Sequence, residues 1–548
     1  MTAADGTGAP LNGEVAVTAT RIGRMSWEVA VAHNGLLLHR DTGNPANAKV
    51  RQRIVRRCTE LAPSLKGHEG ELEERILLAV PSTTEPAAAP RTEREVTPSA
   101  LRFTDLGNAR ALAEQHGTDC IHVHGRGWFT WDGRRWAEDC TGEVTRRAKL
   151  LVGDMLRESA ANPNDPTMRE LARHALRSAT RERIGAMVTL AASEERLAFR
   201  PSDLDANPHL LTVKNGTLDL RSGTLLAHDR AHLITKLAPA VYDPEAQAPL
   251  WHAMLERILP DAEVRSWLKE MIGYGATGLV LDHVVPILWG NGSNGKSTFI
   301  GAVQSVLGDY AKAVPAELLM ASRGDRHPTE RTELEGIRLA VAAETEEGGR
   351  LNEPVIKGLS GGDVISARKC GRDFYTFRPT HKLVLLTNHK PIVRGTDHGV
   401  WRRLRLLPFT VAIPKAEEDA ALPSKLEKEA SGILKWIVEG ARRFLDRGRL
   451  PECAAVTTAT EGYRESQDVL GRWIAEKCTI TPAASCKSSI LYASYKAHVE
   501  ANGERLLSAN AFATALEERG FEKVKASNVF WQGIDLVPDS REDRRYGV

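Results

Sequence analysis

A glycine-rich segment, Gly290–Thr298 (GNGSNGKST), carries the residue types that bind nucleotide phosphates. It fits the pattern G-x-x-x-x-G-K-S/T, in which glycines allow backbone N–H groups to face the phosphates. We expect Lys296 to reach the β- and γ-phosphates and the Ser297 hydroxyl to bind Mg²⁺. The segment therefore predicts a site for ATP and Mg²⁺. Its expected contacts are Gly290, Asn291, Gly292, Ser293, Asn294, Gly295, Lys296, Ser297 and Thr298.

The residues around this loop predict the elements that position it. The apolar run His283–Trp289 is typical of a buried strand that ends at Gly290. After the loop, apolar residues recur at helical spacing up to Gly308, which is placed to end the helix. The order strand, loop, helix directs a helix N-terminus at the phosphates. The apolar helix positions are Phe299, Ile300, Val303, Val306 and Leu307.

A second apolar run, Leu339–Ala343, predicts a strand that ends at Glu344. A carboxylate at the end of such a strand can hold Mg²⁺ or orient the attacking water. Glu346 and Glu347 are alternatives for that role. An acidic cluster on the surface without a catalytic role is the other interpretation.

Two later segments carry a strand-end amide and a pair of arginines. The run Lys382–Pro391 (KLVLLTNHKP) predicts a buried strand whose end presents Asn388, which can position water beside a γ-phosphate. The alternative interpretation is that Asn388 is a simple turn residue without a catalytic role. Arg402 and Arg403 precede another apolar strand, and an arginine supplied across a subunit interface can neutralise transition-state charge. A structural ion pair is the alternative for either arginine.

A basic hairpin is expected between the acidic strand and the asparagine strand. Ile365–Ala367 and Phe374–Phe377 are typical of two short strands, with Arg368, Lys369 and Arg372 at the tip. Such a tip can hold the phosphates of a single strand in the pore of a ring. An ordinary solvated hairpin is the competing interpretation.

The 548-residue chain is long enough for three or four domains. Its net charge of +2 does not indicate a nucleic-acid binder, so any nucleic-acid contact must come from a local basic feature or from several subunits that pool a few positive groups each. No apolar run is long enough to span a membrane and the N-terminus does not resemble a signal peptide, which predicts a cytoplasmic protein. The seven cysteines form no C-x-x-C pair, which argues against a zinc or disulfide framework.

Composition and periodicity divide the chain into six segments. Hairpins are expected in Gly127–Trp136 and His209–Asp229, a helical stretch over residues 143–198, and a turn at Asp203 and Asp205. The expected segments are a small N-terminal region (1–80), a linker (81–98), a mixed α/β domain (99–245), a nucleotide-binding domain (246–412), a helical segment (413–465) and a winged-helix-like domain (466–548).

Five motifs in this order resemble superfamily 3 helicases, and within them the phage and plasmid primase–helicase family that includes the poxvirus protein. The resemblance extends to FTDLGNA near Phe103 and VKNGTLDL near Val213. The motifs are Asn294–Ser297, Glu344–Gly348, Gly361–Arg368, Thr387–Pro391 and Gly395–Arg403.

The resemblance implies an α/β fold: an AAA+-type P-loop ATPase domain with an α/β N-terminal helicase-associated domain and a C-terminal winged-helix-like domain. It implies phosphate and Mg²⁺ roles for Lys296 and Ser297, and a catalytic role for Glu344. Because Thr345 separates Glu344 from Glu346, the water-activating residue stays open. The remaining implied roles are a sensor (Asn388), an arginine finger (Arg403 or Arg402) and pore contacts (Lys369 and Arg372).

The expected function is an ATP-dependent DNA helicase of a phage, plasmid or integrated mobile element, acting in replication as a ring, with a hexamer implied by the resemblance. Expected partners are single-stranded and forked DNA, further copies of the chain and a replication accessory protein. The residues before the linker are too few for the primase fold, so priming is not expected. One alternative is an ATP-assembled DNA-binding initiator or regulator with little unwinding. A nucleotide kinase is the other.

Overall fold

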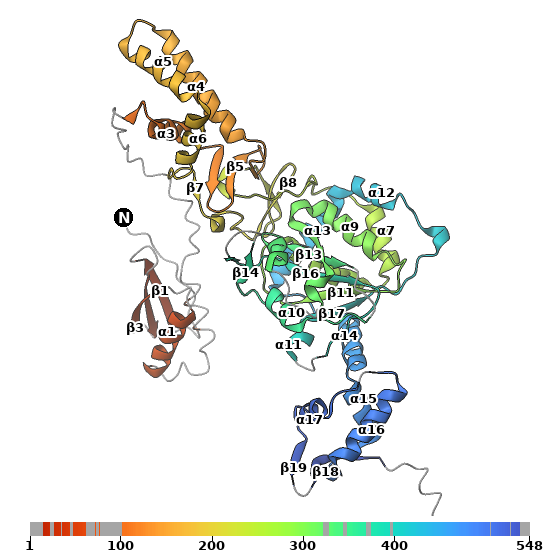
Figure 1. Ribbon diagram of the computed structural model, residues 1–548. Coiled ribbons are helices and arrows are strands. Elements are labelled where there is room, and N and C mark those ends of the chain that lie inside the picture. The colour runs from red at the N-terminus through yellow and green to blue at the C-terminus, as the bar shows by residue number, and fades with distance from the viewer. Residues whose placement is uncertain are drawn as a thin grey trace, which may run out of the picture. The chain divides into compact units, whose positions relative to one another are not determined.

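The computed structural model contains two compact units, residues 1–97 and residues 98–548 (Figure 1). Four of the predicted site residues, Glu344, Glu346, Lys369 and Arg372, lie outside the residues that the structure describes. None of the described helices combines the length and apolar character needed to cross a bilayer. The structure describes residues 15–21, 27–33, 36–43, 48–61, 72, 76, 101–321, 328–343, 348–368, 374–394, 398–504, 506–525 and 528–537.

The first unit contains a three-stranded antiparallel sheet and a helix. The strands follow one another in the order β1-β2-β3, and the apolar side of the helix packs on the sheet. Val29, Val31 and Ile54 are fully buried between them. The elements are β1 (Val15–Arg21), β2 (Trp27–His33), β3 (Leu36–Gly43) and α1 (Ala48–Leu61).

The first part of the second unit contains the helices α3 to α6, and the last three of them divide the helical stretch predicted for residues 143–198. Caps explain the division. The Asp165 side chain accepts from Thr167 N beside Pro166, and the Thr180 side chain accepts from Arg183 N. Each cap satisfies N–H groups that a new helix leaves open, so the chain starts a new helix at these points. The helices are α3 (Asp105–His116), α4 (Glu143–Ala161), α5 (Pro166–Ser178) and α6 (Arg181–Ala191).

Two small sheets confirm the predicted hairpins, in the orders β6-β5-β4-β7 and β10-β9-β8. The predicted turn at Asp203 and Asp205 is also confirmed. Asp203 accepts from Arg200 N at 2.8 Å, and Asp205 accepts from Thr235 N at 2.8 Å. The strands are β4 (Cys120–Val123), β5 (Gly127–Trp131), β6 (Trp136–Glu138), β7 (Ala198–Phe199), β8 (Leu210–Val213), β9 (Gly216–Asp219) and β10 (Thr224–Leu226).

A five-stranded parallel sheet forms the centre of the second unit, which confirms the mixed α/β fold. Its order is β12-β13-β16-β11-β17, so β16 lies between two strands that precede it in sequence. The carboxyl ends of parallel strands meet at one edge, which is where such sheets bind ligands. The strands are β11 (Val285–Trp289), β12 (Ala311–Pro315), β13 (Leu339–Ala343), β16 (Lys382–Thr387) and β17 (Leu404–Pro408).

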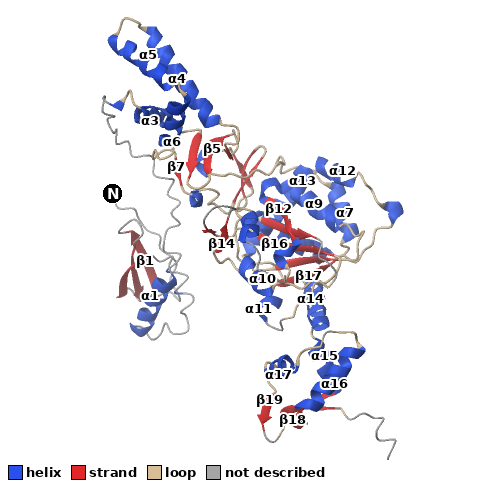
Figure 2. Ribbon diagram, viewed as in Figure 1, coloured by secondary structure: helices blue, strands red, loops and turns tan. Residues whose placement is uncertain are grey.

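Helices cover both faces of this sheet (Figure 2). Leu339 and Val341 of β13 point into one core and Ala340 and Ala342 into the other, as the two-residue period of a strand requires. The first core includes α7 (Pro249–Ile258), α8 (Ala262–Ala276), α9 (Lys296–Leu307) and α13 (Ala430–Arg447), and the second includes α10 (Glu353–Ser360), α11 (His398–Trp401) and part of α14 (Ala454–Gln467).

The C-terminal elements follow the order helix, strand, helix, helix, strand, strand. The sequence does not indicate the first strand, β18, because the alternation of Cys478 and Ile480 stops at Pro482 and small residues follow. The sheet order is β18-β20-β19, and Trp473 and Trp531 are fully buried in its core. The elements are α15 (Val469–Lys477), β18 (Cys478–Lys487), α16 (Ser488–Ala501), α17 (Ala509–Glu517), β19 (Glu522–Lys525) and β20 (Val529–Leu536).

A buried histidine next to β16 makes the stability of the fold depend on pH. His381 is 1% exposed, and its Nε2 lies 3.0 Å from the Leu359 carbonyl oxygen. Burial, reinforced by the charge of Lys382, lowers the pKa of His381 from 6.5 to about 4. Below pH 6.5 the unfolded chain therefore binds a proton here that the folded chain excludes. Stability falls as the pH drops from 6.5 towards 4.

We predict that in His381→Gln the free energy of unfolding falls less steeply towards acid pH. The difference from the unaltered protein should reach about 3 kcal/mol between neutral pH and the folded-state pKa of His381. Urea unfolding at a series of pH values measures this free energy. His124→Gln, at an exposed position, is the matched control and should keep the slope of the unaltered protein. An unchanged slope in His381→Gln would contradict the prediction.

Candidate functional site

The glycine-rich loop of residues 290–295, named the phosphate loop after its predicted role, joins the carboxyl end of β11 to the N-terminus of α9. Two of its glycines are required by geometry. At Gly290 a Cβ would lie 2.1 Å from Asn294 Nδ2 and 2.3 Å from the Phe409 oxygen. Gly295 has a φ of +77°, and a Cβ there would lie 2.7 Å from Ile258 Cγ2. A side chain at either position would force the loop or these neighbours to shift.

Lys296 is the first residue of α9, and its ammonium group holds the loop together. It is 5% exposed, and Nζ donates to Gly290 O at 2.7 Å, Asn294 Oδ1 at 2.9 Å and Asn388 Oδ1 at 3.2 Å. All three acceptors are neutral oxygens. Burial lowers the pKa of Lys296 because these partners do not offset its desolvation. An anion at this position would supply the missing negative charge.

Asn388 reaches Lys296 because of the register of the sheet. Thr387 ends β16 opposite Trp289 of β11, so the residue after each strand lies at the same edge. Gly290 N donates to Thr387 O at 3.3 Å, and Trp289 Nε1 donates to Asn388 O at 3.1 Å. The structure thus brings together the loop lysine and the amide that sequence patterns singled out separately.

The predicted carboxylates Glu344 and Glu346 lie outside the described residues. The residue before them, Ala343, ends β13 and pairs with Leu386 of β16. β13 therefore ends at the same edge of the sheet as the phosphate loop and Asn388.

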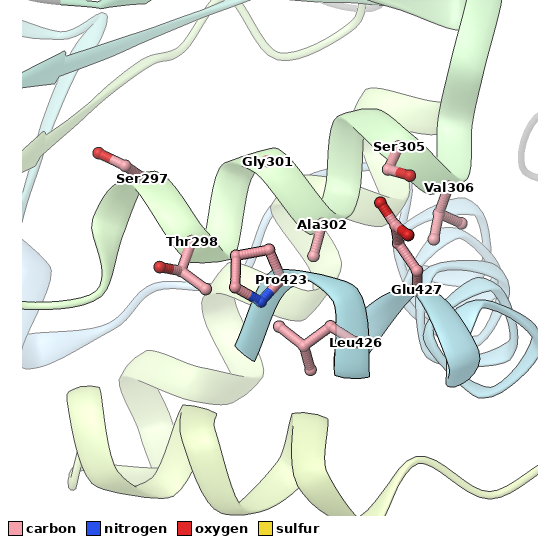
Figure 3. Close-up of a pocket in the computed structure, with 9 residues that line it drawn as sticks. All are labelled: Ser297, Thr298, Gly301, Ala302, Ser305, Val306, Pro423, Leu426 and Glu427. Atoms are coloured by element: carbon pink, nitrogen blue, oxygen red, sulfur yellow. The ribbon is translucent and has the colours of Figure 1, made fainter. Parts of the chain in front are cut away.

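The predicted Mg²⁺ ligand Ser297 is exposed at the N-terminus of α9. Beside it a cavity of about 140 Å³ separates α9 from α12 (Leu422–Lys428) (Figure 3). Small and apolar side chains line most of this cavity. It begins next to the phosphate loop and follows one side of α9. The lining residues are Ser297, Thr298, Gly301, Ala302, Ser305, Val306, Pro423, Leu426 and Glu427.

The structure separates Arg402 from Arg403. Arg403 is 8% exposed; its Nε donates to Ser360 Oγ at 3.2 Å and its Nη1 to Gly399 O at 2.6 Å. Arg402 is exposed. Both precede β17, whose first residue pairs with Val285, so they lie at the amino edge of the sheet. The phosphate loop is at the other edge, about 16 Å away along β11.

The basic hairpin consists of β14 (Ile365–Arg368) and β15 (Phe374–Phe377), which pair antiparallel. The Arg368 guanidinium lies 5.3 Å from the centre of the Phe374 ring, and Phe374 is 59% exposed. The other two predicted contacts, Lys369 and Arg372, fall between the described ends of these strands.

The helix α14 fixes the segment that follows Asn388, which the sequence did not indicate. The Tyr463 hydroxyl donates to the Pro391 carbonyl oxygen, and Val393 N donates to Gln467 Oε1 at 3.1 Å. Tyr463 is fully buried and packs edge-on against Trp401, with ring centres 5.3 Å apart. The residues of α14 show no motif, because their role depends on contacts 72 and 74 residues apart in sequence.

We predict that Tyr463→Phe destabilises the fold by about 1–3 kcal/mol, because the buried Pro391 carbonyl loses its O–H donor. The loss should also speed hydrogen–deuterium exchange of the amides in residues 388–394. The control is Tyr495→Phe, since Tyr495 is equally buried and its hydroxyl has no hydrogen-bond partner among the described residues. Equal exchange in the two variants would argue against a role of Tyr463 in holding this segment.

Two family descriptions match the chain over these regions. "D5 N terminal like" matches residues 109–260, which contain most of the helical region and both small sheets. A "family of unknown function" (DUF5906) matches residues 288–403, which run from β11 to Arg403. The second match spans the phosphate loop, Asn388 and the arginine pair.

The chain is also similar to proteins of large DNA viruses. It is 25% identical over 405 residues to a "Putative helicase" of Acanthamoeba polyphaga mimivirus, covering 65% of this chain and 41% of that protein. It is 28% identical over 310 residues to a "Putative primase" of African swine fever virus, covering 51% and 32%. The chain thus spans about a third to two fifths of the length of these relatives.

A solved structure titled as the apo form of the NrS-1 C-terminal region aligns with 79% of this chain and 99% of that one, at 8% identity and a TM-score of 0.45. Together, the family and viral matches confirm the resemblance to primase–helicase-like proteins that the sequence motifs predicted.

Proposed function

From its kinship with viral primase–helicase-like proteins, we propose that the protein is an ATP-dependent DNA helicase that works as a ring in replication. The contact of Lys296 Nζ with both the phosphate loop and Asn388 carries this proposal. It joins a phosphate-binding cation to an amide that can orient water at the γ-phosphate. The names of the relatives support DNA as the substrate.

In this proposal ATP binds with its phosphates at the N-terminus of α9, where Gly295 offers no capping side chain to compete for the open N–H groups. Mg²⁺ binds to the Ser297 hydroxyl and to a carboxylate that follows β13, with Glu344 and Glu346 as candidates. Asn388 and that carboxylate orient the attacking water. Sequence resemblance supports an AAA+-type assignment, and the position of β16 between β11 and β13 agrees with it.

The positions of the two arginines support a site that a neighbouring subunit completes. Arg402 is exposed at the amino edge of the sheet, too far from its own phosphate loop to contact it. Arg403 is occupied by Ser360 and Gly399 of its own subunit. We therefore assign the arginine finger to Arg402 and a structural role to Arg403. A hexameric ring, as the resemblance implies, provides such interfaces.

DNA contacts of the ring are assigned to the β14–β15 hairpin. Arg368 offers a charge beside the exposed ring of Phe374, a combination that suits a single strand with phosphates and stacked bases. Lys369 and Arg372 belong to the same proposed contact. We place the protein in the cytoplasm, in the replication of a phage, plasmid or integrated element, with forked DNA and an accessory protein as partners.

The alternative is an ATP-assembled initiator that binds DNA with little unwinding. The C-terminal order helix, strand, helix, helix, strand, strand favours it, because winged-helix-like domains commonly bind duplex DNA. Unwinding of a forked duplex separates the two functions.

We predict that Lys296→Ala lowers ATP hydrolysis by on the order of a hundredfold or more and abolishes unwinding of a forked duplex. The loss of a cation that contacts phosphates is the physical reason. Lys496→Ala, an exposed position on α16, is the control and should retain both activities. If Lys296→Ala stops hydrolysis while the protein still supports replication of its element, the helicase proposal is wrong and the initiator is favoured.

We predict that Arg402→Ala binds ATP normally but hydrolyses it on the order of a thousandfold more slowly. Mixing it with Lys296→Ala should restore part of the activity, because some interfaces then pair an intact Lys296 with an intact Arg402. Arg403→Ala should instead lower the melting temperature, because Ser360 and Gly399 lose a buried partner. Mixed rings without any restored hydrolysis would count against the shared site.

A further inference from the structure

We propose that a row of arginines on α5 and at the start of α6 binds the phosphate backbone of duplex DNA. The row consists of Arg169, Arg173, Arg177 and Arg181 and is named the arginine row. The proposal rests on the proposed function for the choice of DNA as the polymer. It involves no residue of the nucleotide site and none of the β14–β15 hairpin.

Within α5, the spacing of Arg169, Arg173 and Arg177 places their charges on one side of the helix. They recur at every fourth residue, so successive ones lie about 6 Å apart along the helix axis. All four are exposed. Arg169, Arg173 and Arg177 belong to α5, and Arg181 is the first residue of α6.

A buried polar network fixes the direction in which α5 presents these side chains. On the inner side of the helix, His174 Nε2 lies 2.8 Å from Asn108 Oδ1, and Asn108 Nδ2 donates to Ser178 Oγ at 2.9 Å. Burial lowers the pKa of His174, which favours the neutral ring in this network. Because Asn108 belongs to α3, this network sets the rotation of α5 about its axis.

The charges of the row are not neutralised by nearby acidic residues. Residues 166–183 contain five arginines and two glutamates, whereas the whole chain has a net charge of only +2. Arg183, outside the row, pairs with Asp105, and Arg169 Nε donates to the Pro163 carbonyl oxygen at 3.0 Å. In the part of the chain that the structure describes, Arg173, Arg177 and Arg181 form neither an ion pair nor a side-chain hydrogen bond within the protein.

These features favour a duplex backbone over a single strand. Regularly spaced guanidinium groups on a fixed helix suit regularly spaced phosphates, which arginine can bind through two parallel hydrogen bonds. Single-strand sites also use aromatic side chains on which bases stack. Residues 166–183 contain no Phe, Tyr or Trp, so the row offers phosphate contacts alone.

The test is binding of a blunt-ended DNA duplex to the full chain without nucleotide, measured over a series of KCl concentrations. The double variant Arg173→Gln with Arg177→Gln should bind on the order of tenfold more weakly at low salt. The slope of log affinity against log salt should become shallower by about 2, since two phosphate contacts are lost. A thermal melt checks that the fold is retained.

The matched control is Arg146→Gln with Arg157→Gln. It removes the same charge from the neighbouring helix α4, where Arg146 pairs with Glu143 and Arg157 with Asp154. The control should lose much less affinity. An unchanged affinity and slope in the row variant, or an equal loss in the control, would overturn the proposal, as would a loss for single-stranded DNA alone.

The same experiment separates this inference from the proposed function. If the unaltered protein neither hydrolyses ATP nor unwinds a fork, but the row variant still loses duplex affinity, the helicase proposal fails and the arginine row stands.

Discussion

The buried ammonium group of Lys296 is the interaction on which the candidate site depends. A buried cation without a carboxylate needs several well-placed oxygens, and here they come from three places: Gly290, Asn294 and Asn388. The Gly290 oxygen is available because this residue has no Cβ that would clash with Asn294 and Phe409. The Asn388 oxygen is available because β16 pairs with β11 in one register. Loop conformation and sheet topology are therefore both needed to place one charge.

The parallel sheet separates two kinds of positive charge. Lys296 lies at the carboxyl edge, and its three neutral oxygen partners do not neutralise its charge. At the amino edge, Lys382 is fully buried and donates to the Leu279 and Thr380 carbonyl oxygens at 3.2 and 3.0 Å, which fixes the loop after α8. Arg403 has the same kind of structural role. Arg402 is exposed beside these structural cations, and its distance from its own phosphate loop is what makes a neighbouring subunit necessary in the proposed ring.

The sequence predicts those parts of the site whose signals are local. An apolar strand, a glycine loop and an amphipathic helix occupy consecutive residues, and Asn388 follows directly on its own apolar strand. The sequence could not place Tyr463 or Gln467, because their partners are distant in the chain and their own helix carries no motif. It could not separate Arg402 from Arg403 either. Their burial is decided by α10, which supplies Ser360, and not by the pair itself.

A chain of polar contacts joins the β4–β7 sheet to the central parallel sheet. Trp136 N donates to Ile234 O at 2.8 Å, and Arg135 pairs with Asp309, so the β4–β7 sheet is attached to the start of β12.

Beyond that point, the buried Arg338 guanidinium joins three elements. It donates to Leu210 O at 2.7 Å and Ala276 O at 2.8 Å, and lies 4.5 Å from the Tyr310 ring centre. Breaking this junction would leave a buried cation without partners, which costs several kcal/mol. The small β8–β10 sheet and the strand β13 are thus held in one arrangement. If ATP binds and moves the central sheet as we propose, this junction would move with the sheet, and so would a DNA duplex held by α5.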